Sequence, residues 1–343
     1  MALFDGKRIL ITGGTGSLGQ ALLRRITTGE LGRPKKIIIL SRDEAKQHAM
    51  KTELAHRRSA TDDVFYGNLA EFVDFRIGDL KDYSSLRPSM QDADIVLNTA
   101  ALKQVPVCEY FPMEAVKTNI LGVDNLVRCI KENALPIELF VSVSTDKACK
   151  PINTYGMTKA IQERIVLEAN YSCRPTKFLC VRYGNVMASR GSVIPLFQAQ
   201  IRNGGPVTIT TQEMTRFMMS LDTAVDTIFA ALKMSVPGTT LVPVVPSART
   251  LDVAEVMIGG RKMDIQYIGV RPGEKIHEIL VSDEETHRTT REGDYFMIHS
   301  ILPEVRTKQL GPPALTKELS SEDYVLGKDA LRELLKQEKH LDF

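Results

Sequence analysis

The stretch that ends at Ile26 constrains the fold more than any other part of the chain. An apolar, β-branched segment from Lys7 to Thr12 has the composition of a short buried strand, and a glycine-rich turn from Gly13 to Gly19 follows it directly. Apolar residues then recur at helical spacing, at Ala21, Leu22, Leu23 and Ile26. A strand, a glycine turn and a helix in this order predict the first unit of a dinucleotide-binding sheet. A glycine turn that binds nothing is the less favoured alternative.

Three of the four glycines of the turn have separate roles in such a unit. Gly13 permits the tight turn, Gly16 lets the backbone approach a pyrophosphate, and Gly19 lets the helix pack closely on the strand. The first N–H groups of the helix and the positive end of its dipole would then bind the phosphates. We therefore predict these cofactor-binding residues: Gly13, Thr15, Gly16, Ser17, Leu18 and Gly19.

The residues after the second expected strand favour NADP over NAD. Arg42 follows that strand and Lys46 comes one helical turn later, and an arginine at this place accommodates a 2′-phosphate. Asp43 keeps NAD open, since an acidic residue there holds the ribose 2′-hydroxyl, and Lys46 fits a solvated loop equally well. The ends of the next strands supply further predicted cofactor contacts, at Asp79, Leu80, Ala100, Ala101 and Lys103.

Five further apolar segments have the composition of strands, and helix-forming segments separate them regularly. They run from Lys36 to Leu40, Phe72 to Ile77, Asp94 to Thr99, Leu139 to Val143 and Lys177 to Arg182. This alternation predicts an α/β fold with a doubly wound parallel (Rossmann) sheet. Ligands in such sheets bind outside the carboxyl ends of the strands, where these motifs lie.

The pattern changes after residue 184, where shorter strands and loops replace the regular alternation. We expect residues 1–184 to form the NADP-binding Rossmann domain, with 220–245 returning to it. Residues 185–219 and 246–343 are then a smaller C-terminal substrate-binding lobe and tail. Within this part we expect a short helix after the basic turn at 271–275 and a charged, irregular tail with a strand at 295–298 and a final helix near 328–336.

Composition narrows the class of protein. The formal net charge is only +2, with no long run of one sign, so neither nucleic acid nor an anionic membrane surface is an expected partner. The five cysteines form no CxxC pair, which predicts reduced thiols and no zinc site. Since the sequence contains no signal-peptide h-region and no apolar run of membrane-spanning length, we expect a soluble, cytoplasmic protein without a membrane partner.

A second informative stretch follows the expected strand at 139–143. It should turn and enter a helix that carries Tyr155 and Lys159 one turn apart on one face. Beside a nicotinamide, Lys159 would lower the pKa of the phenol, so that Tyr155 can act as general base for an alcohol while Thr145 holds the same hydroxyl. The pattern Tyr-x-x-x-Lys is weak alone, because Tyr324 and Lys328 repeat it in the tail.

Asp146 and Lys147 point to a more specific reaction. Alcohol oxidation needs no acid and base beyond the tyrosine, but a sugar 4,6-dehydratase does. Once C4 is a ketone, one group must take the acidic proton from C5 while another protonates the departing C6 hydroxyl. An adjacent carboxylic acid and amine can fill both roles. The alternative is an ordinary surface loop, and the position beside Tyr155 argues against it.

Asn119 is the polar exception in the apolar stripe of a long amphipathic helix expected at 112–133. Two interpretations are open. The amide is either exposed on the helix surface, or it points inward and braces the strand or helix of the active site.

Seven motifs between Lys7 and Glu278 extend these observations. They read T-G-G-T-G-S-L-G, L-S-R-D-E, A-A-L-K-Q-V-P, S-T-D-K-A-x-x-P-I-N-x-Y-G-x-T-K, Y-G-N-V-x-A-S-R-G-S-V-I-P, M-T-R-F-M and R-P-G-E-K. Together they resemble the inverting UDP-N-acetylglucosamine 4,6-dehydratases, in the polysaccharide-biosynthesis branch of the extended short-chain dehydrogenase/reductases.

The resemblance implies a tightly held NADP, a UDP-N-acetylhexosamine substrate and a homo-oligomer between dimer and hexamer. It makes Tyr155 and Lys159 the pair that oxidises C4, Thr145 the residue that positions the C4 hydroxyl, Lys147 the base at C5 and Asp146 the acid at C6. The residues implied to bind the UDP-sugar are Lys103, Asn185, Arg190, Ser192, Arg216, Arg271 and Glu274.

Two other functions stay open at this point. A UDP-sugar epimerase acting at C4 or C2 would use Tyr155 but has no strict need for Asp146 and Lys147. A non-catalytic NADP-sensing protein would be expected to have lost the tyrosine or Lys159, and both are present. The sequence also leaves open whether C2 of the sugar carries an N-acetyl group or a hydroxyl.

Overall fold

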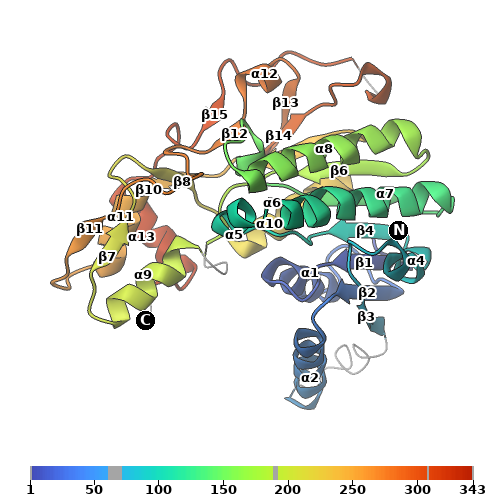
Figure 1. Ribbon diagram of the computed structural model, residues 1–343, viewed down its shortest axis with the longest axis horizontal. Coiled ribbons are helices and arrows are strands. Elements are labelled where there is room, and N and C mark those ends of the chain that lie inside the picture. The colour runs from blue at the N-terminus through green and yellow to red at the C-terminus, as the bar shows by residue number, and fades with distance from the viewer. Residues whose placement is uncertain (1, 61–71, 188–191, 307–308, 342–343) are drawn as a thin grey trace.

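The chain folds around a nine-stranded sheet that has helices on both faces and a smaller lobe to one side (Figure 1). This computed structural model describes residues 2–60, 72–187, 192–306 and 309–341. The order of strands across the sheet is β13 (Thr289–Glu292), β14 (Tyr295–Ile298), β9 (Thr240–Pro243), β6 (Lys177–Val181), β5 (Leu139–Val143), β4 (Ile95–Asn98), β1 (Arg8–Thr12), β2 (Lys36–Ser41) and β3 (Val73–Ile77).

All strands from β9 to β3 in this order are parallel, and β14 and β13 add an antiparallel edge. The order reverses at β1, which lies between β2 and β4, and this reversal opens a crevice at the carboxyl ends of the strands. The predicted doubly wound parallel sheet is therefore confirmed, and the crevice lies where its ligands are expected.

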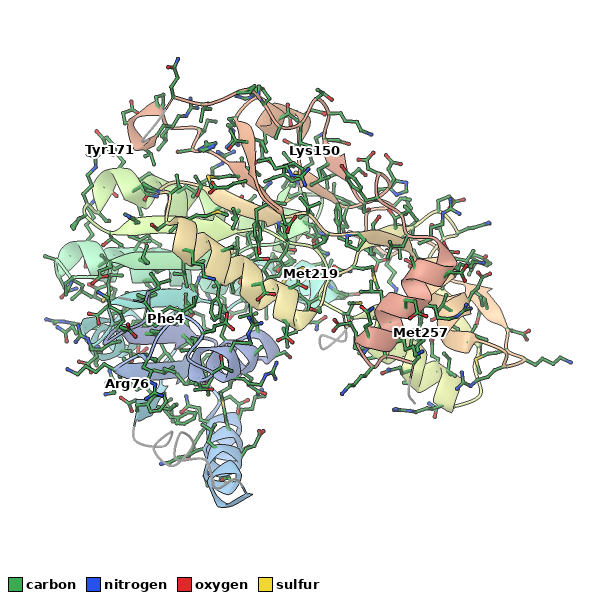
Figure 2. The ribbon with its side chains drawn as sticks, turned by 180° about the vertical axis from the view of Figure 1, so that it is seen from behind. Phe4, Arg76, Lys150, Tyr171, Met219 and Met257 are labelled. Carbon is green, nitrogen blue, oxygen red and sulfur yellow. The ribbon has the colours of Figure 1, made fainter. Side chains whose placement is uncertain are left out.

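The two layers of helices pack on opposite faces because strand residues alternate between them. Ile9 and Ile11 of β1 belong to the core layer with α1 (Ser17–Thr27) and α10 (Leu221–Met234), whereas Leu10 belongs to the other layer. That second layer holds α4 (Tyr83–Gln91), α7 (Gly122–Glu132) and α8 (Thr154–Ser172). Phe4 closes the first layer by packing edge-on against Phe229 of α10, with ring centroids 5.7 Å apart (Figure 2).

The smaller lobe has its own apolar core, which includes the buried Met257 (Figure 2). It is built from α9 (Val193–Arg202), β7 (Val207–Ile209), β8 (Thr215–Phe217), β10 (Ser247–Arg249), α11 (Thr250–Ile258), β11 (Ile265–Tyr267) and α13 (Lys328–Gln337). Leu331 and Leu335 of α13 are fully buried in this core, so the end of the chain belongs to the lobe.

The described residues contain several further elements. They are α2 (Glu44–Ala60), α5 (Val105–Tyr110), α6 (Pro112–Ala115), a π-helical turn (Val116–Leu121), the 3-10 helices at Asp146–Ala148 and Pro303–Val305, β12 (Ile279–Val281), α12 (Asp283–Thr286) and β15 (Leu319–Ser320). Among the described residues, none of the helices combines the length and the apolar character that crossing a membrane requires.

Two expectations about the C-terminal part are wrong. The strand expected at 295–298 exists, but β13 and β14 extend the Rossmann sheet through β9, so 289–298 is not part of the substrate lobe. The basic turn at 271–275 leads into strand β12 instead of a short helix. The apolar residues of β12 pair there with β15, whose short sequence gave no strand signal. Residues 220–245 form α10 and β9 against the main sheet.

Candidate active site

A cavity of about 1250 Å³ opens at the carboxyl ends of the parallel strands, with the smaller lobe on its other side. It gathers nearly all of the predicted site residues: Gly13, Thr15, Gly16, Ser17, Leu18, Gly19, Arg42, Asp43, Lys46, Asp79, Leu80, Ala100, Ala101, Lys103, Thr145, Lys147, Tyr155, Lys159, Asn185, Ser192, Arg216, Arg271 and Glu274. Asp146 is not on the wall, since it is fully buried behind Lys147, and Arg190 lies outside the described residues.

The glycine turn has the shape that a dinucleotide requires. Gly13 has a φ of +65°, and a Cβ there would lie 2.8 Å from the Cα of Ala100. A Cβ on Gly19 would lie 2.5 Å from the Cα of Gly14, which shows how closely α1 approaches the turn. In the described structure no side chain caps α1, so its first N–H groups remain for phosphate oxygens. The turn therefore fits a dinucleotide pyrophosphate.

The structure distinguishes the roles of Arg42, Asp43 and Lys46, which follow β2 and whose roles the sequence left open. Asp43 accepts a hydrogen bond from the Lys46 backbone N–H at 3.0 Å and forms an ion pair with the Lys46 side chain, which lowers the pKa of Asp43. Arg42 is more loosely held. Its side chain is 60% exposed, and Nη1 lies 3.7 Å from a carboxylate oxygen of Asp79. Arg42 is thus the cation that a ligand can recruit, and Lys46 mainly serves Asp43.

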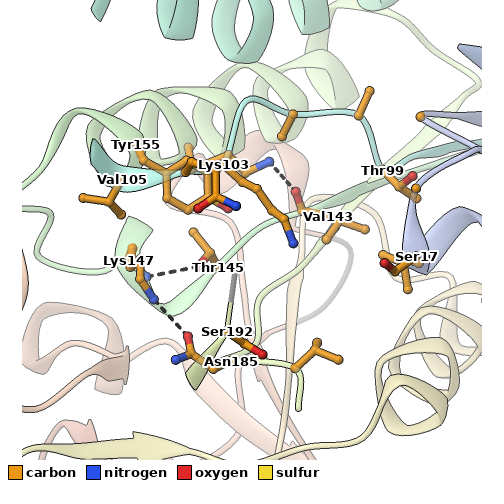
Figure 3. Close-up of a pocket in the computed structure, with 18 of the residues that line it drawn as sticks. Ser17, Thr99, Lys103, Val105, Val143, Thr145, Lys147, Tyr155, Asn185 and Ser192 are labelled. Atoms are coloured by element: carbon orange, nitrogen blue, oxygen red, sulfur yellow. Dashed lines mark hydrogen bonds between the residues drawn. The ribbon is translucent and has the colours of Figure 1, made fainter. Parts of the chain in front are cut away.

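Strand β5 delivers Thr145 and Lys147 to the cavity. The chain leaves β5 at Val143 and makes one 3-10 turn, which Thr145 caps by accepting a hydrogen bond from the Lys147 N–H at 3.4 Å (Figure 3). The Thr145 hydroxyl donates to Oδ1 of Asp146 at 2.9 Å. This leaves one lone pair of the Thr145 hydroxyl able to accept a hydrogen bond from a bound hydroxyl group.

The Lys147 ammonium group is held by three oxygens. Its Nζ lies 3.0 Å from Oδ1 of Asp146 and 3.4 Å from Oε1 of Glu278, and it donates to Oδ1 of Asn185 at 3.1 Å (Figure 3). Burial alone would lower the pKa of Lys147, but Asp146 and Glu278 raise it well above its usual range. Lys147 is therefore protonated in the ligand-free site, and any basic role requires it to release a proton first.

Tyr155 is the second residue of α8, and Asn153 fixes the start of that helix by accepting from the Gly156 N–H at 2.7 Å. Burial raises the pKa of Tyr155 to about 12, while the charge of Lys147 and a hydrogen bond with Thr145 oppose this shift. The phenol thus depends on nearby positive charge for its ionisation. Lys147 provides this charge in the ligand-free site.

Lys159 lies one turn further along α8, as predicted, but its amino group is bonded elsewhere. Nζ donates to the Val143 carbonyl at 2.5 Å and to Oε1 of Gln162 at 2.7 Å. Burial lowers its pKa to about 8. The prediction that Lys159 lowers the pKa of Tyr155 finds no support in the structure, where Lys147 and Thr145 have that effect. Lys159 instead ties α8 to the end of β5 and faces the cavity.

The sequence interpretation missed Glu278 and Gly156. Glu278 lies just before β12, is 1% exposed and lines the cavity beside Lys147. Gly156 lets α8 approach the 3-10 turn, since a Cβ there would lie 2.1 Å from the Lys147 carbonyl oxygen. No spacing pattern marks either residue, because both contacts join segments that are distant in the chain or separated by a turn.

Among the predicted substrate residues, Arg216 lines the cavity from β8 of the smaller lobe and has an additional structural task. Its Nη1 and Nη2 donate to the carbonyls of Thr215, Ile276 and Lys275 at 2.7, 3.1 and 3.0 Å. Arg216 therefore fixes the segment that leads to Glu278. Arg271 is exposed, and Ser192 has a buried hydroxyl without a hydrogen-bond partner among the described residues.

Asn119 braces the active site, as one of its two interpretations predicted. It is fully buried in the π-helical turn, accepts from the Leu102 N–H at 2.8 Å and donates to the Leu102 carbonyl at 2.9 Å. Its amide also donates to Thr158 Oγ1 at 3.0 Å, and Thr158 donates to the Tyr155 carbonyl at 2.8 Å. One side chain thus joins the loop after β4 to the helix that carries Tyr155.

Replacing Asn119 by alanine should therefore destabilise the fold by about 1–3 kcal/mol, because the backbone N–H and carbonyl of Leu102 both lose their hydrogen-bond partner. Urea denaturation would measure the change in the free energy of unfolding. Asn125→Ala is a suitable control, since Asn125 donates to one carbonyl, that of Leu80 at 2.9 Å. An Asn119 variant no less stable than this control would contradict the bracing role.

Comparison with known proteins places this site in a family. A family model described as "Polysaccharide biosynthesis protein" matches residues 9–300. The chain belongs to this family.

Two curated relatives bear different activities in their names. A UDP-glucose 4-epimerase of Rickettsia bellii is 42% identical over 301 residues, which cover 86% of this chain and 84% of that protein. A UDP-N-acetylglucosamine 4,6-dehydratase (inverting) of Campylobacter jejuni is 38% identical over 299 residues, with the same coverage of both chains. The chain thus has relatives that are named for two different reactions.

Solved structures agree with the fold. The X-ray structure of Pen from Bacillus thuringiensis is 34% identical, has a TM-score of 0.87 and covers 98% of this chain and 99% of its own. The dTDP-glucose 4,6-dehydratase DesIV of Streptomyces venezuelae, solved with NAD, is only 18% identical, with a TM-score of 0.65 over 78% of this chain and 86% of its own. The second likeness shows a shared fold alone.

Proposed function

We propose that this chain is a UDP-N-acetylglucosamine 4,6-dehydratase that inverts C5, uses NADP as an internal hydride carrier and forms a UDP-4-keto-6-deoxyhexose for surface polysaccharides or glycoproteins. The observation that carries the proposal is that Lys147, Tyr155 and Thr145 share one cavity wall, with Asp146 buried directly behind Lys147. An oxidation that ends at C4 needs the tyrosine only. The additional buried acid and amine match an elimination.

In this mechanism each side chain handles a proton at a stated atom. Thr145 accepts a hydrogen bond from the C4 hydroxyl, and Tyr155 takes that proton. Lys147 takes the proton from C5, and Asp146 supplies one to the oxygen leaving C6, which departs as water. The bound cofactor would accept hydride from C4 and return it to C6. Burial and the nearby charge of Lys147 lower the pKa of Lys103. The Lys103 side chain lines the cavity, where it can contact the substrate and the cofactor.

The UDP-sugar itself is proposed from the Campylobacter relative and from residues that line the cavity. Arg216 and Arg271 offer guanidinium groups for the diphosphate, while Asn185, Ser192 and Glu274 offer hydrogen-bonding groups. Arg190 belongs to the same proposed set. The name of the Rickettsia relative favours the competing function, a UDP-sugar 4-epimerase.

Incubation with UDP-N-acetylglucosamine in deuterated water separates the two functions. A dehydratase gives a 4-keto-6-deoxy product that carries deuterium at C5, and NMR of the product shows both features. An epimerase gives the C4 epimer with hydrogen retained at C5. Absence of turnover on any UDP-hexose, together with stoichiometric bound NADP, would instead indicate a non-catalytic NADP-binding protein.

The preference for NADP is proposed to depend on Arg42. Because Asp43 is engaged by Lys46 while Arg42 is exposed and loosely paired, a 2′-phosphate can recruit the guanidinium group. Arg42→Ala should weaken NADP binding by roughly 10-fold or more, the value of a hydrogen bond to a charged group. NAD affinity, measured by the same calorimetric titration, should hardly change. An equal loss for both dinucleotides would contradict this role.

The proposed homo-oligomer and cytoplasmic location have support of a more general kind. Tyr110, Phe111 and Met113 of the α5–α6 segment are 83%, 61% and 60% exposed, and neighbouring large apolar side chains of this sort often mark a surface that another subunit covers. The five cysteines are free and buried, which suits a reducing compartment. Light scattering of the purified protein would give the number of subunits.

A further inference from the structure

Glu278 is a buried carboxylate at the active site that the steps above do not use. Its side chain lines the cavity, Oε1 lies 3.4 Å from the Lys147 Nζ, and Oε2 has no hydrogen-bond partner among the described residues. The residue is held rigidly, because its N–H donates to Ser321 Oγ at 2.9 Å and its carbonyl accepts from the Ser321 N–H at 2.8 Å. Such a group is expensive to bury unless it has a task.

The proposed reaction requires a neutral Lys147 side chain, but in the ligand-free site this side chain is a cation. To take a proton from C5, the amine must be neutral, yet it lies as a cation between Asp146 and Glu278. Asn185 accepts a hydrogen bond from Nζ, but an amide is no base. Asp146 must itself carry a proton to deliver it at C6. Glu278 is then the neighbouring group that is able to receive the proton of Lys147.

We propose that Glu278 is a positioning residue for the proton of Lys147: it accepts that proton after C4 has been oxidised and so frees the amine to act at C5. This inference rests on the proposed dehydratase function and adds a residue to it.

The transfer balances in protons and electrons. The Lys147 ammonium and the Glu278 carboxylate become an amine and a carboxylic acid. The amine then takes the C5 proton, the electrons of the C5–H bond form the C5–C6 double bond, and the C6–O bond breaks as Asp146 protonates the leaving oxygen. Inversion requires that C5 receive its new proton on the opposite face, so this proton comes from solvent. Lys147 keeps the proton taken from C5, and Glu278 releases its own proton to solvent, which restores the ammonium and the carboxylate. Asp146 is a carboxylate paired with Lys147 in the ligand-free site, so it takes a proton from solvent before elimination and is again a carboxylate after delivering it. Tyr155 releases the proton of the C4 hydroxyl to solvent, which closes the balance.

The surroundings of the pair favour this transfer once the site fills. When substrate excludes water, an ion pair loses more solvation than the neutral amine and acid that replace it. The spacing of 3.4 Å marks a weaker ion pair than the 3.0 Å contact of Lys147 with Asp146. The other nearby cations, Arg216 and Lys103, oppose a charged Lys147, since like charges repel.

Glu278→Gln tests the role, because it keeps the size of the side chain and removes its ability to take a proton. With UDP-N-acetylglucosamine, dehydration should slow by about 10²-fold or more, the usual loss for a missing acid–base group. Reduction of bound NADP by C4 oxidation should persist, and deuterium uptake at C5 should be lost. Glu318→Gln is the matched control: Glu318 also pairs with a lysine, Lys150 at 2.5 Å, but it lies outside the cavity, so the dehydration rate of this variant should stay near that of the wild type.

Glu278→Asp provides a second measurement in case the glutamine variant does not fold. It retracts the carboxylate from Lys147, so dehydration should slow and the isotope effect of C5-deuterated substrate should rise, because proton removal from C5 becomes rate-limiting. A Glu278 variant that dehydrates like the wild type, or a Glu318 variant that loses as much, overturns the role of Glu278. Absence of dehydration by the wild-type protein in the same assay overturns the proposed function instead.

Discussion

Lys147→Ala is expected to stop dehydration of UDP-N-acetylglucosamine while C4 oxidation survives. Tyr155 and Thr145 stay in place in this variant, but the group that would take the C5 proton is gone. The loss of a general base typically costs about 10²–10⁴-fold in rate. The absorbance of reduced nicotinamide should therefore rise after mixing with substrate and persist, because hydride finds no eliminated intermediate to reduce. Stopped-flow absorbance and product NMR measure the two steps separately.

The charge of Lys147 also lowers the pKa of Tyr155, so its loss should limit the rate of the C4 oxidation that survives in the variant. Lys147 opposes the rise in pKa that burial imposes on Tyr155, so C4 oxidation in the variant should need a higher pH than in the wild type. Following cofactor reduction across pH values tests this shift. The displacement is toward alkaline pH because the phenol loses a stabilising cation.

Lys150→Ala is a matched control for this experiment. Lys150 also pairs with two carboxylates, Glu318 and Asp283 at 2.5 and 3.2 Å, but it lies outside the cavity. Its removal should leave both steps unchanged. If Lys147→Ala dehydrates at the wild-type rate, Lys147 is not the base at C5. If both steps vanish while the variant stays folded by circular dichroism, its charge is needed for oxidation, and the separation of roles proposed here is wrong.

The parallel core and the cofactor side of the site could be predicted because their signals are local. A short β-branched run such as Ile37 to Ile39 is typical of a buried strand, and the spacing of Gly13, Gly16 and Gly19 serves one short turn. Once the alternation of strands and helices is recognised, topology alone brings these turns to one edge of the sheet. The cavity that collects them confirms this reasoning.

The contacts that sequence could not reveal join distant segments. Glu278 reaches Lys147 because Arg216 and Ser321 fix its segment, and all of these residues come from separate parts of the chain. The strand at 295–298 was predicted, but its place in the main sheet was not, because β14 pairs with β9, which lies about fifty residues earlier. β13 gave no strand signal, since it is a short edge strand with polar residues such as Arg291 and Glu292. The pairing of such strands follows from tertiary packing, which leaves no periodic trace.

Arg182→Met should destabilise the protein by about 3–5 kcal/mol, the usual cost of removing one partner from a buried ionic network. Arg182 follows β6 and is 3% exposed. It forms a two-pronged contact with Glu163 of α8, at 3.0 and 2.6 Å, and a second with Glu285 of α12, at 2.6 and 3.0 Å. Without the guanidinium group, two buried carboxylates lose their main partner, although Arg288 stays 3.2 Å from Glu285.

The pH dependence of this loss distinguishes the ionic contribution from a packing defect. Burial raises the pKa of Glu285, but Arg182 and other partners outweigh it and lower the value to about 2, from 4.5 for a free side chain. A carboxyl whose folded pKa is depressed stabilises the fold above its unfolded pKa, and this stabilisation is lost as pH falls from about 4.5 toward 2. The variant should therefore differ most from the wild type at neutral pH, and the difference should shrink in acid.

Urea denaturation at several pH values measures this difference, and Arg332→Met serves as the control. Arg332 pairs with Asp329 at 3.4 Å on the exposed face of α13, where an ion pair contributes at most about 1 kcal/mol. A loss for Arg182→Met that is equally large at pH 3 and pH 7 would point to a packing defect.

The ionic network also anchors the helix that carries Tyr155 and Lys159 to the C-terminal segment, because Glu163 belongs to this helix. The same variant should therefore lose activity at temperatures below its unfolding transition.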